Sequence, residues 1–304
     1  MKNIYISILN YNGAKDTIEC LESLQKIQRD GFELHILVID NASKEKFVIP
    51  KDFQQKYSVT IVRTEENKGF AGGNNVAMKL ALEKGADYVL LLNNDTTVHE
   101  NFLTELFSTA ESDEKIGIVA PKIYFAKGSE FHKDRYKTGD IGNVIWYAGG
   151  IFDWGNVIGS HRGVDEVDHG QYDTKEPTAF ASGCCMLIKI EVLQKIGLFD
   201  EKYFLYYEDN DLVFRVKKAG YKIMYSPKAV VWHKNASSTG GSGSSMQDYY
   251  ITRNRLLFGL GYAPLRSKIA LVKESLALLF NGRSMQKKGV IDFYKGKLGK
   301  GNMT

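Results

Sequence analysis

Cysteine is scarce in this sequence, and long apolar runs are absent. The three cysteines, Cys20 and the adjacent pair Cys184 and Cys185, provide no disulfide framework of the kind that small secreted domains use. No positively charged segment followed by an apolar one precedes the first predicted strand, so we expect a reducing, cytoplasmic environment. Every apolar run stays well short of the roughly 20 residues that a membrane-spanning helix needs, and we expect the chain not to cross a bilayer.

Basic charge is concentrated near the end of the chain. The 304 residues are 43% hydrophobic and 25% charged, enough for one large or two modest domains with a true core. The formal net charge is +4, but from Pro264 onward 9 Lys and Arg residues stand against 2 Asp and Glu residues. That local balance of +7 leaves −3 for residues 1–263.

Strand and helix patterns alternate through the first 120 residues. Short apolar segments typical of buried strands are followed by segments with apolar residues about one turn apart. The predicted strands are 4–9, 34–40, 59–63, 88–93 and 116–121, and the predicted helices are 14–27, 71–83 and 101–110. This alternation predicts an α/β fold, Rossmann-like, with a mostly parallel sheet and helices on both faces.

The pattern is less regular beyond residue 121. Glycine-rich, polar residues at 124–175 indicate short strands and turns. A further strand is predicted at 180–189, and helices at 209–218, 247–260 and 267–280. The segment SSTGGSGSS at 237–245 has the composition of a mobile loop. We expect one domain over residues 1–263, with halves at 1–120 and 121–263, and a basic amphipathic helical tail at 264–304.

Polar residues follow three of the predicted strands where each strand ends. These ends read NYNG at 10–13, DNAS at 40–43 and NNDTT at 93–97. Ligands of open α/β sheets bind at the carboxyl ends of the strands, so Asn10, Asp40 and Asp95 are predicted to line a nucleotide site. The alternative is that they only cap the helices that follow. Three such positions together favour the site.

The segment KGFAGGNN at 68–75 lies between a predicted strand and a predicted helix. Backbone N–H groups and the positive end of the helix can meet an anion there, and we expect Lys68, Gly69 and Asn74 to contact a nucleotide donor. The glycine spacing fits neither GxGxxG nor a P-loop, which argues against a dehydrogenase or a kinase. The alternative is a glycine turn that lets the helix pack closely.

The motifs of the chain, taken in order, resemble those of a known family. They are NYNG, VIDNAS, NKGFAGGNN, LLNNDTT, YYEDNDL and VVWHKN. This set resembles a family 2 glycosyltransferase of the GT-A fold, in the group with bacterial rhamnosyltransferases and galactofuranosyltransferases, from Ile4 to about Phe258. The resemblance implies an inverting transfer of a sugar from a nucleotide donor to an acceptor hydroxyl, with Mn²⁺ or Mg²⁺ on the donor diphosphate.

The resemblance also implies the ligands of that metal. NNDT stands where the family has its DxD element, so Asp95 is expected to bind the metal, and Asn93 to hydrogen-bond the donor. His233, after a later apolar strand, corresponds to the second protein ligand. Hard divalent cations prefer carboxylate oxygen, and imidazole suits Mn²⁺ better than Mg²⁺. A capping aspartate and a structural histidine are the alternatives.

The acidic segment YYEDNDL at 206–212 is expected to supply a general base. The attacking hydroxyl must lose its proton, and the resemblance assigns this task to Asp209. Tyr207 and Glu208 are expected on the acceptor side, where aromatic residues offer a wall for a sugar. An acidic first turn on a surface helix is the alternative. An RN pair that the family often carries points to Arg253 as a contact of the donor diphosphate. A surface helix with solvated charges is the alternative there.

The tail combines its basic charge with an apolar stripe. The stripe is formed by Ile269, Val272, Leu276, Leu279 and Phe280. Such a helix suits an anionic membrane surface that holds a lipid-linked acceptor, with the protein peripheral at the inner face of the cell membrane. Packing on the catalytic domain, or on a second copy in a homodimer, is equally consistent. Nucleic acid is not expected, because the basic residues are not interleaved with aromatic ones.

The sequence therefore predicts a metal-dependent, inverting glycosyltransferase. The expected donor is dTDP-rhamnose or a UDP-sugar, and the expected acceptor is a glycan or lipid-linked hydroxyl in the synthesis of cell-surface polysaccharide. A sugar nucleotidyltransferase is disfavoured because no GxGTR-like loop follows the first strand. A non-catalytic carbohydrate-binding or scaffold module of the same fold is the other alternative, because Asn93 replaces a carboxylate.

Overall fold

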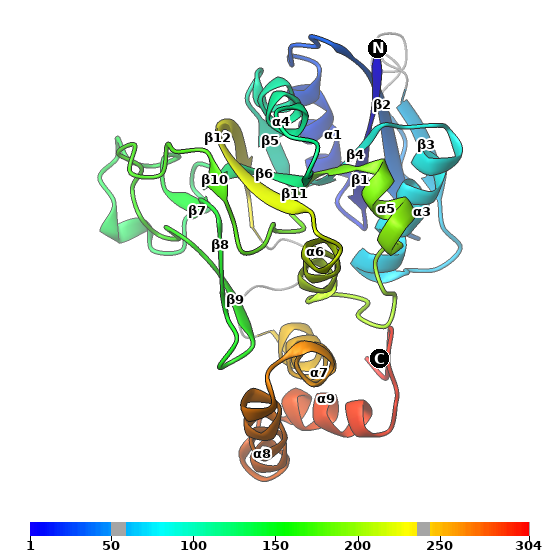
Figure 1. Cartoon of the computed structure of the whole chain (residues 1–304), viewed down its shortest axis with the longest axis vertical. Coiled ribbons are helices and arrows are strands. Elements are labelled where there is room, and N and C mark those ends of the chain that lie inside the picture. The colour runs from blue at the N-terminus through cyan, green and yellow to red at the C-terminus, as the bar shows by residue number, and fades with distance from the viewer. Residues whose placement is uncertain (50–58, 236–243, 304) are drawn as a thin grey trace.

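A ten-stranded sheet forms the centre of the molecule (Figure 1). The computed structural model describes residues 1–49, 59–235 and 244–303. The path of the sheet runs β10-β12-β6-β11-β4-β1-β2-β3, with β5 beside β12 and β7 beside β6. The strands of the path are β1 Lys2–Asn10, β2 Phe32–Asp40, β3 Val59–Arg63, β4 Tyr88–Asn93, β6 Ile116–Phe125, β10 Glu176–Pro177, β11 Cys185–Lys189 and β12 Lys222–His233. The two side strands are β5 Thr96–Val98 and β7 Ile145–Tyr147.

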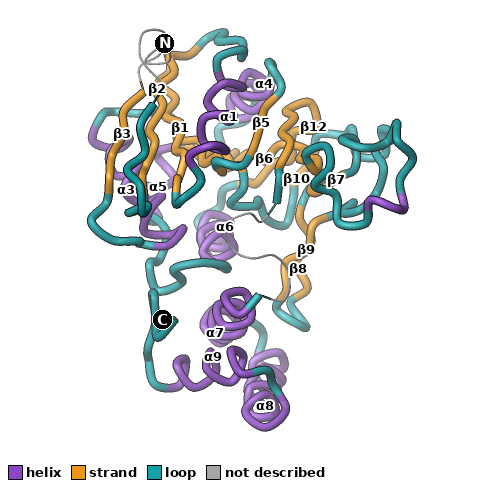
Figure 2. The backbone as a smooth tube through the Cα atoms, turned by 180° about the vertical axis from the view of Figure 1, so that it is seen from behind, coloured by secondary structure: helices purple, strands orange, loops and turns teal. Residues whose placement is uncertain are grey.

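Helices cover both faces of this sheet, as the sequence predicts. Two lie on one face, α1 Ala14–Leu24 and α4 Phe102–Glu111. Three lie on the other, α3 Gly69–Glu83, α5 Ile190–Ile196 and α6 Glu208–Lys218 (Figures 1 and 2). Strands β1 to β4 pair in parallel, and β6 pairs with β12 in parallel, whereas β11 runs antiparallel to both β4 and β6. The α/β, mostly parallel architecture is therefore confirmed.

The sheet is buried because its central strands are apolar on both faces. In β4, the residues from Tyr88 to Leu92 are all buried, as expected for a strand with helices on both sides. The predicted strand at 180–189 is shorter than expected. Only Cys185–Lys189 pairs with neighbours, and the preceding residues 180–184 form a connection that reaches the candidate site.

Three helices pack together at the end of the molecule away from the sheet (Figure 2). They are α7 Ser245–Tyr262, α8 Leu265–Asn281 and α9 Ser284–Tyr294. The hairpin of β8 Gly150–Asp153 and β9 Ile158–His161 joins them to the rest through Val157, which shares an apolar cluster with Leu256, Phe258, Leu271 and Val290. Since α7 belongs to this group, the helical unit begins before residue 264.

The predicted loop at 237–245 lies outside the described residues except for Ser244 and Ser245, where Ser244 caps α7 by accepting a hydrogen bond from the N–H of Gln247. In the described part of the chain, no helix has the length and apolar character to span a membrane.

Candidate active site

Three strand ends meet at one edge of the sheet. In the parallel register of β1 with β2, Asn10 lies opposite Asp40, and in that of β1 with β4, Leu9 lies opposite Asn93. Asp95 follows in the turn between β4 and β5. The polar residues that the sequence singles out at these ends are therefore neighbours in space, as expected for the carboxyl ends of parallel strands.

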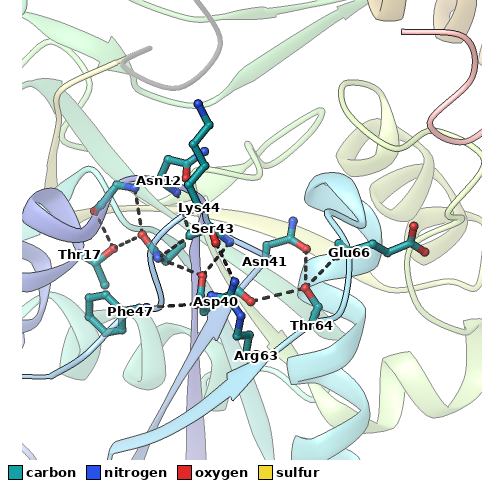
Figure 3. Close-up of polar contacts among 12 residues, drawn as sticks. Asn12, Thr17, Asp40, Asn41, Ser43, Lys44, Phe47, Arg63, Thr64 and Glu66 are labelled. Carbon is teal, nitrogen blue, oxygen red and sulfur yellow. Dashed lines mark hydrogen bonds and ion pairs between the residues drawn. The ribbon is translucent and has the colours of Figure 1, made fainter. Parts of the chain in front are cut away.

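Asp40 organises the loop that follows β2 (Figure 3). Its carboxylate is fully buried and accepts hydrogen bonds from the N–H groups of Ser43 and Phe47, each at 3.1 Å, while Arg63 forms an ion pair with it. Burial opposes ionisation, but these hydrogen bonds and the Arg63 contact more than offset it and lower the pKa of Asp40. Asp40 therefore shapes the edge of the sheet and has no exposed surface for a donor.

Asn10 also stabilises this edge of the sheet through side-chain hydrogen bonds. Its amide nitrogen donates to Ser43 Oγ at 3.1 Å, and its amide oxygen accepts from the N–H of Gly13 at 3.2 Å and from Thr17 Oγ1 at 3.0 Å. Asn94, after β4, donates to the same Thr17 hydroxyl at 3.0 Å. These amides tie the ends of β1, β2 and β4 together.

The start of α3 differs from the expected anion site. The N–H groups of Phe70 and Ala71 both donate to the Phe204 carbonyl, at 2.7 and 3.2 Å, so the positive end of α3 is occupied by another loop of the chain. Gly69 has a left-handed φ of +69°, and a Cβ there would lie 2.3 Å from the same carbonyl oxygen. The close-packing alternative therefore describes this glycine.

Two other predicted donor contacts also lie at this helix. Asn74 is buried, accepting from Ser7 Oγ at 2.9 Å and donating to the Phe70 carbonyl at 3.1 Å, which fastens α3 to β1. The N–H of Lys68 donates to Asn41 Oδ1 at 3.0 Å, and Lys68 itself is half-buried. Of the three, only the Lys68 side chain is available to a ligand.

Asp95 and His233 form a close pair. The antiparallel pairing of β12 with β5 sets His233 opposite Thr96, and His233 Nε2 lies 3.1 Å from Asp95 Oδ1. Both side chains are nearly buried, and His233 Nδ1 has no hydrogen-bond partner among the described residues. Burial opposes ionisation of Asp95, but His233 and Lys234 more than offset this and lower the pKa of the carboxyl.

The donor atoms of this pair fit a divalent cation. Two adjacent ligands of a six-coordinate ion, each about 2.1 Å from it, are about 3 Å apart, which matches the observed separation. The described residues contain no cluster of three or more His, Cys, Asp or Glu side chains able to hold a metal. Asn93, two residues before Asp95, is half-buried at the end of β4.

A second histidine, which the sequence analysis did not single out, lies close to this pair. The Trp146 ring stands between His161 and His233, with ring centroids 4.2 and 4.7 Å away. His161 Nδ1 contacts the Trp146 carbonyl at 3.0 Å, and burial lowers the pKa of His161 to about 4, so the ring is neutral at pH 7. His161 ends the short strand β9, and no motif in the glycine-rich segment around it indicates a site residue.

The acidic start of α6 is buried rather than a solvated first turn. Asp209 Oδ2 accepts from the N–H of Gly183 at 3.1 Å, and Oδ1 accepts from the N–H of Asn210 at 2.7 Å. Burial raises the pKa of Asp209, although these hydrogen bonds act in the opposite direction. Glu208 is more deeply buried, its Oε2 has no partner among the described residues, and burial followed by the Asp209 charge raises the pKa of Glu208 well above its usual value.

Consecutive residues connect Asp209 to the strand ends. Gly183 donates its N–H to Asp209, and the carbonyl of the next residue, Cys184, accepts from the N–H of Asn93 at 2.8 Å. A cavity of about 380 Å³ opens beside Asp209. Its lining includes Glu208 and His161, together with residues from α7 and α8. The expected base therefore stands between the strand-end site and a cavity large enough for a sugar.

The loop before α6 is strained and firmly held. Phe204, Tyr206 and Tyr207 have φ values of 64°, 66° and 72°, a left-handed conformation that costs roughly 1–3 kcal/mol at each bulky residue. Tyr207 donates its hydroxyl to the Val157 carbonyl at 2.8 Å, which aims its ring away from solvent. The expected acceptor-side pair, Tyr207 and Glu208, thus lies at the cavity wall.

Arg253 and Asn254 hold this strained loop from α7. Asn254 Nδ2 contacts the carbonyls of Tyr203, Leu205 and Tyr206, each at 2.8 Å. Arg253 is fully buried and its Nη2 donates to the carbonyls of Lys202 and Tyr203 at 3.2 and 3.0 Å. The structure thus places the Arg253 guanidinium inside the protein, against the loop that precedes Asp209, and not at a surface where it would meet a donor diphosphate.

This edge of the sheet combines polar strand ends and the Asp95–His233 pair with Asp209 at the start of α6, an arrangement suited to a nucleotide-sugar-dependent transferase. Comparison with known proteins gives the family. Residues 2–255 match the family described as "Glycosyltransferase like family 2", and the chain belongs to it. The resemblance seen in the sequence is confirmed, and the protein is a glycosyltransferase.

Curated relatives cover most of the chain at low identity. The low-salt glycan biosynthesis hexosyltransferase Agl10 of Haloferax volcanii is 22% identical over 84% of this chain and 75% of its own length. The N-acetylglucosaminyl-diphospho-decaprenol L-rhamnosyltransferase of Mycobacterium tuberculosis is 27% identical over 69% of each chain. The dTDP-rhamnosyl transferase RfbF of Shigella flexneri is 24% identical over 90% of this chain and 86% of its own.

Solved structures confirm the GT-A fold. GalNAc-T7, crystallised with UDP, GalNAc and Mn²⁺, aligns with a TM-score of 0.66 at 16% identity, covering 97% of this chain and 55% of that one. The mannosyltransferase PcManGT from Pyrobaculum calidifontis, in complex with GDP-Man and Mn²⁺, aligns with a TM-score of 0.54 at 16% identity, covering 96% and 74%. At this identity the similarity concerns the fold alone.

Proposed function

We propose that the protein is an inverting, metal-dependent glycosyltransferase that acts in the synthesis of a cell-surface polysaccharide. The proposed donor is dTDP-rhamnose or another nucleotide sugar such as a UDP-sugar, and the proposed acceptor is a hydroxyl of a glycan or lipid-linked sugar. The name of one relative, a dTDP-rhamnosyl transferase, supports dTDP-rhamnose as the donor, and that of another, an N-acetylglucosaminyl-diphospho-decaprenol L-rhamnosyltransferase, supports a lipid-linked acceptor. The observation that carries the proposal is the connection through residues 183–184 between Asp209 and the strand end next to the Asp95–His233 pair.

The donor diphosphate is proposed to lie against the ends of β1, β2 and β4. A divalent cation held by Asp95 and His233 would offset the negative charge of the diphosphate as it leaves. Asn93 and Lys68 are the partly accessible side chains that we assign to donor contact. Asn10, Asp40 and Asn74 are buried with hydrogen-bond partners, so we assign them to shaping the donor site.

Asp209 is proposed to take the proton of the acceptor hydroxyl. As the hydroxyl oxygen forms its bond to the anomeric carbon, the bond from that carbon to the diphosphate oxygen breaks, and its electron pair leaves with the nucleoside diphosphate. The proton passes to an Asp209 carboxylate oxygen, which burial has made a stronger base than an exposed aspartate. A single displacement of this kind inverts the anomeric configuration. The acceptor sugar would occupy the cavity beside Glu208 and His161.

A donor assay tests the proposal directly. Purified protein is incubated with Mn²⁺ and a panel of nucleotide sugars, chosen after a thermal-shift screen of nucleoside diphosphates, since a bound ligand raises apparent stability. We expect slow, Mn²⁺-dependent release of nucleoside diphosphate in the wild type and its loss in Asp209→Asn. Release of pyrophosphate would indicate a nucleotidyltransferase. Binding of nucleotides without turnover by any donor would instead indicate a non-catalytic module.

A further inference from the structure

One face of α8 carries apolar side chains that no described part of the chain covers. Leu265, Ile269, Leu276 and Phe280 are 73%, 49%, 50% and 78% exposed, and their spacing places them along one side of the helix. We name these four residues the α8 apolar face. On the opposite side of α8, Leu271 is buried in the apolar cluster shared with α7 and α9.

Basic side chains flank the α8 apolar face. Arg266, Lys268 and Lys273 lie beside it in the sequence of the helix, and none of the three forms an ion pair within the described residues. The acidic residue of α8, Glu274, is paired with Arg255 of α7 at 2.7 Å. Long basic side chains can bury their carbon stems along apolar surface while the charge stays in water. The helix therefore combines an exposed apolar stripe with uncompensated positive charge.

The position of α8 connects this face to the acceptor cavity. The helix lies at the tip of the molecule farthest from the N-terminus (Figure 1). Glu274, Ser275 and Leu278, on the packed side of α8, line the cavity that also contains Asp209. The cavity is thus separated from the α8 apolar face by the thickness of one helix, roughly 10 Å.

We propose that the α8 apolar face inserts into the surface of an anionic lipid bilayer, and that α8 thereby holds the acceptor cavity at the membrane. The role of this membrane contact rests on the proposed function, because a lipid-linked acceptor could place its sugar in the cavity while its lipid stays in the bilayer. The charge distribution favours a bilayer over a second copy of the chain. In a symmetric contact through this face, the same unpaired basic residues would approach one another, whereas anionic headgroups attract them.

Vesicle flotation of the full-length protein tests this proposal. The probes are vesicles of phosphatidylcholine alone and vesicles that also contain phosphatidylglycerol. We expect the wild type to float with the anionic vesicles. The double variant L276S/F280S should bind them at least about tenfold more weakly, because two apolar side chains no longer insert into the bilayer. The double variant V48S/F131S is the matched control, since both residues are exposed apolar positions outside α8, and it should float like the wild type.

A charge-reversal variant tests the role of the basic residues, and measurements of activity and oligomeric state serve as controls. K268E/K273E should lose binding to anionic vesicles to a similar extent. Nucleoside diphosphate release in solution should be the same in the wild type and L276S/F280S, which shows that the variant is folded. If release occurs but the wild type does not float, the membrane proposal is wrong and the glycosyltransferase proposal stands. A wild-type dimer that L276S/F280S converts to a monomer would likewise overturn the membrane proposal in favour of a second copy.

Discussion

His233 Nε2 and Asp95 Oδ1 lie 3.1 Å apart, although the two residues are 138 positions apart in the sequence. The contact exists because β12 runs antiparallel to β5, which follows Asp95 directly. A carboxylate and an imidazole at this separation can both bind one cation, so that the pair supplies two protein ligands.

Removal of either proposed ligand, Asp95 or His233, is expected to weaken binding of the metal. In Asp95→Asn and in His233→Ala, the Mn²⁺ concentration that gives half-maximal donor turnover should rise about tenfold or more, because one of two protein ligands is lost. His99→Ala is the matched control, since His99 is an exposed histidine near the same strands. The measurement is a Mn²⁺ titration of nucleoside diphosphate release. An unchanged titration in both ligand variants would place the metal elsewhere.

The two adjacent carboxylates at the start of α6 are expected to behave differently. Asp209→Asn should lower turnover by about 10²–10⁴-fold, since the acceptor hydroxyl loses its base. Glu208→Gln should retain activity within a few-fold, because burial raises the pKa of Glu208 well above its usual value and the protonated side chain resembles glutamine. Steady-state kinetics of the two variants make the comparison. The reverse order of effects would assign the base to Glu208.

The pH dependence of turnover should reflect the raised pKa of Asp209. Only the ionised carboxylate accepts a proton, so turnover should fall as the pH falls through the Asp209 pKa, which burial places above the ordinary value of 3.8. A pH–rate profile of the wild type, at saturating Mn²⁺ and donor, locates this acid limb. A rate that stays flat down to pH 3.8 would contradict the assignment.

The same shift predicts a change in stability. A raised pKa in the folded state means that the proton-bound form is favoured by folding, so this contribution is present below the unfolded pKa and is lost as the pH rises through the folded pKa. At pH 7 the ionised, buried carboxylate therefore destabilises the protein. Asp209→Asn should raise the free energy of unfolding at pH 7 and have less effect near pH 4. Urea unfolding at both pH values measures the difference, and a variant less stable than the wild type at pH 7 would contradict it.

Asn254 is expected to act as a positioning residue for the loop before Asp209. In Asn254→Asp a carboxylate oxygen replaces the nitrogen that contacts three carbonyls, and the resulting repulsion should cost roughly 1–3 kcal/mol or more. We expect kcat to fall while the Mn²⁺ titration stays unchanged, because the metal ligands lie on other strands. Asn281→Asp, at an exposed position at the end of α8, is the control. A fall in thermal stability with unchanged kcat would assign Asn254 to stability alone.

The sheet and the strand-end residues could be predicted because their patterns are local. Apolar runs such as the one ending at Leu92 mark buried strands, and the polar residues after them mark the carboxyl edge. The predicted helical tail at 264–304 includes α9, but the sequence did not give the bounds of this helix, because Gly289, Val290 and Asp292 are buried against other helices while the polar remainder has weak periodicity. Contacts with the other helices, and not local periodicity, therefore determine where α9 forms.

Long-range contacts also account for the residues that sequence reasoning placed differently. The N–H groups at the start of α3 resemble an anion site, but the Phe204 carbonyl, which is remote in the chain, occupies them. Arg253 carries a charge suited to phosphate, yet its partners are carbonyls of the strained loop. His161 lies at the end of the short strand β9, and contacts with Trp146 and the cavity lining bring it to the site. None of these pairings is expressed in the spacing of nearby residues.

The most direct test of the account is a crystal structure of the protein with Mn²⁺ and a nucleoside diphosphate, with the ion located by its anomalous scattering. We predict one anomalous peak within about 2.5 Å of both Asp95 and His233, on the diphosphate, with Asp209 facing the ligand across the cavity. A peak bound by other side chains, or a diphosphate bound away from the ends of β1, β2 and β4, would contradict the proposed site and mechanism.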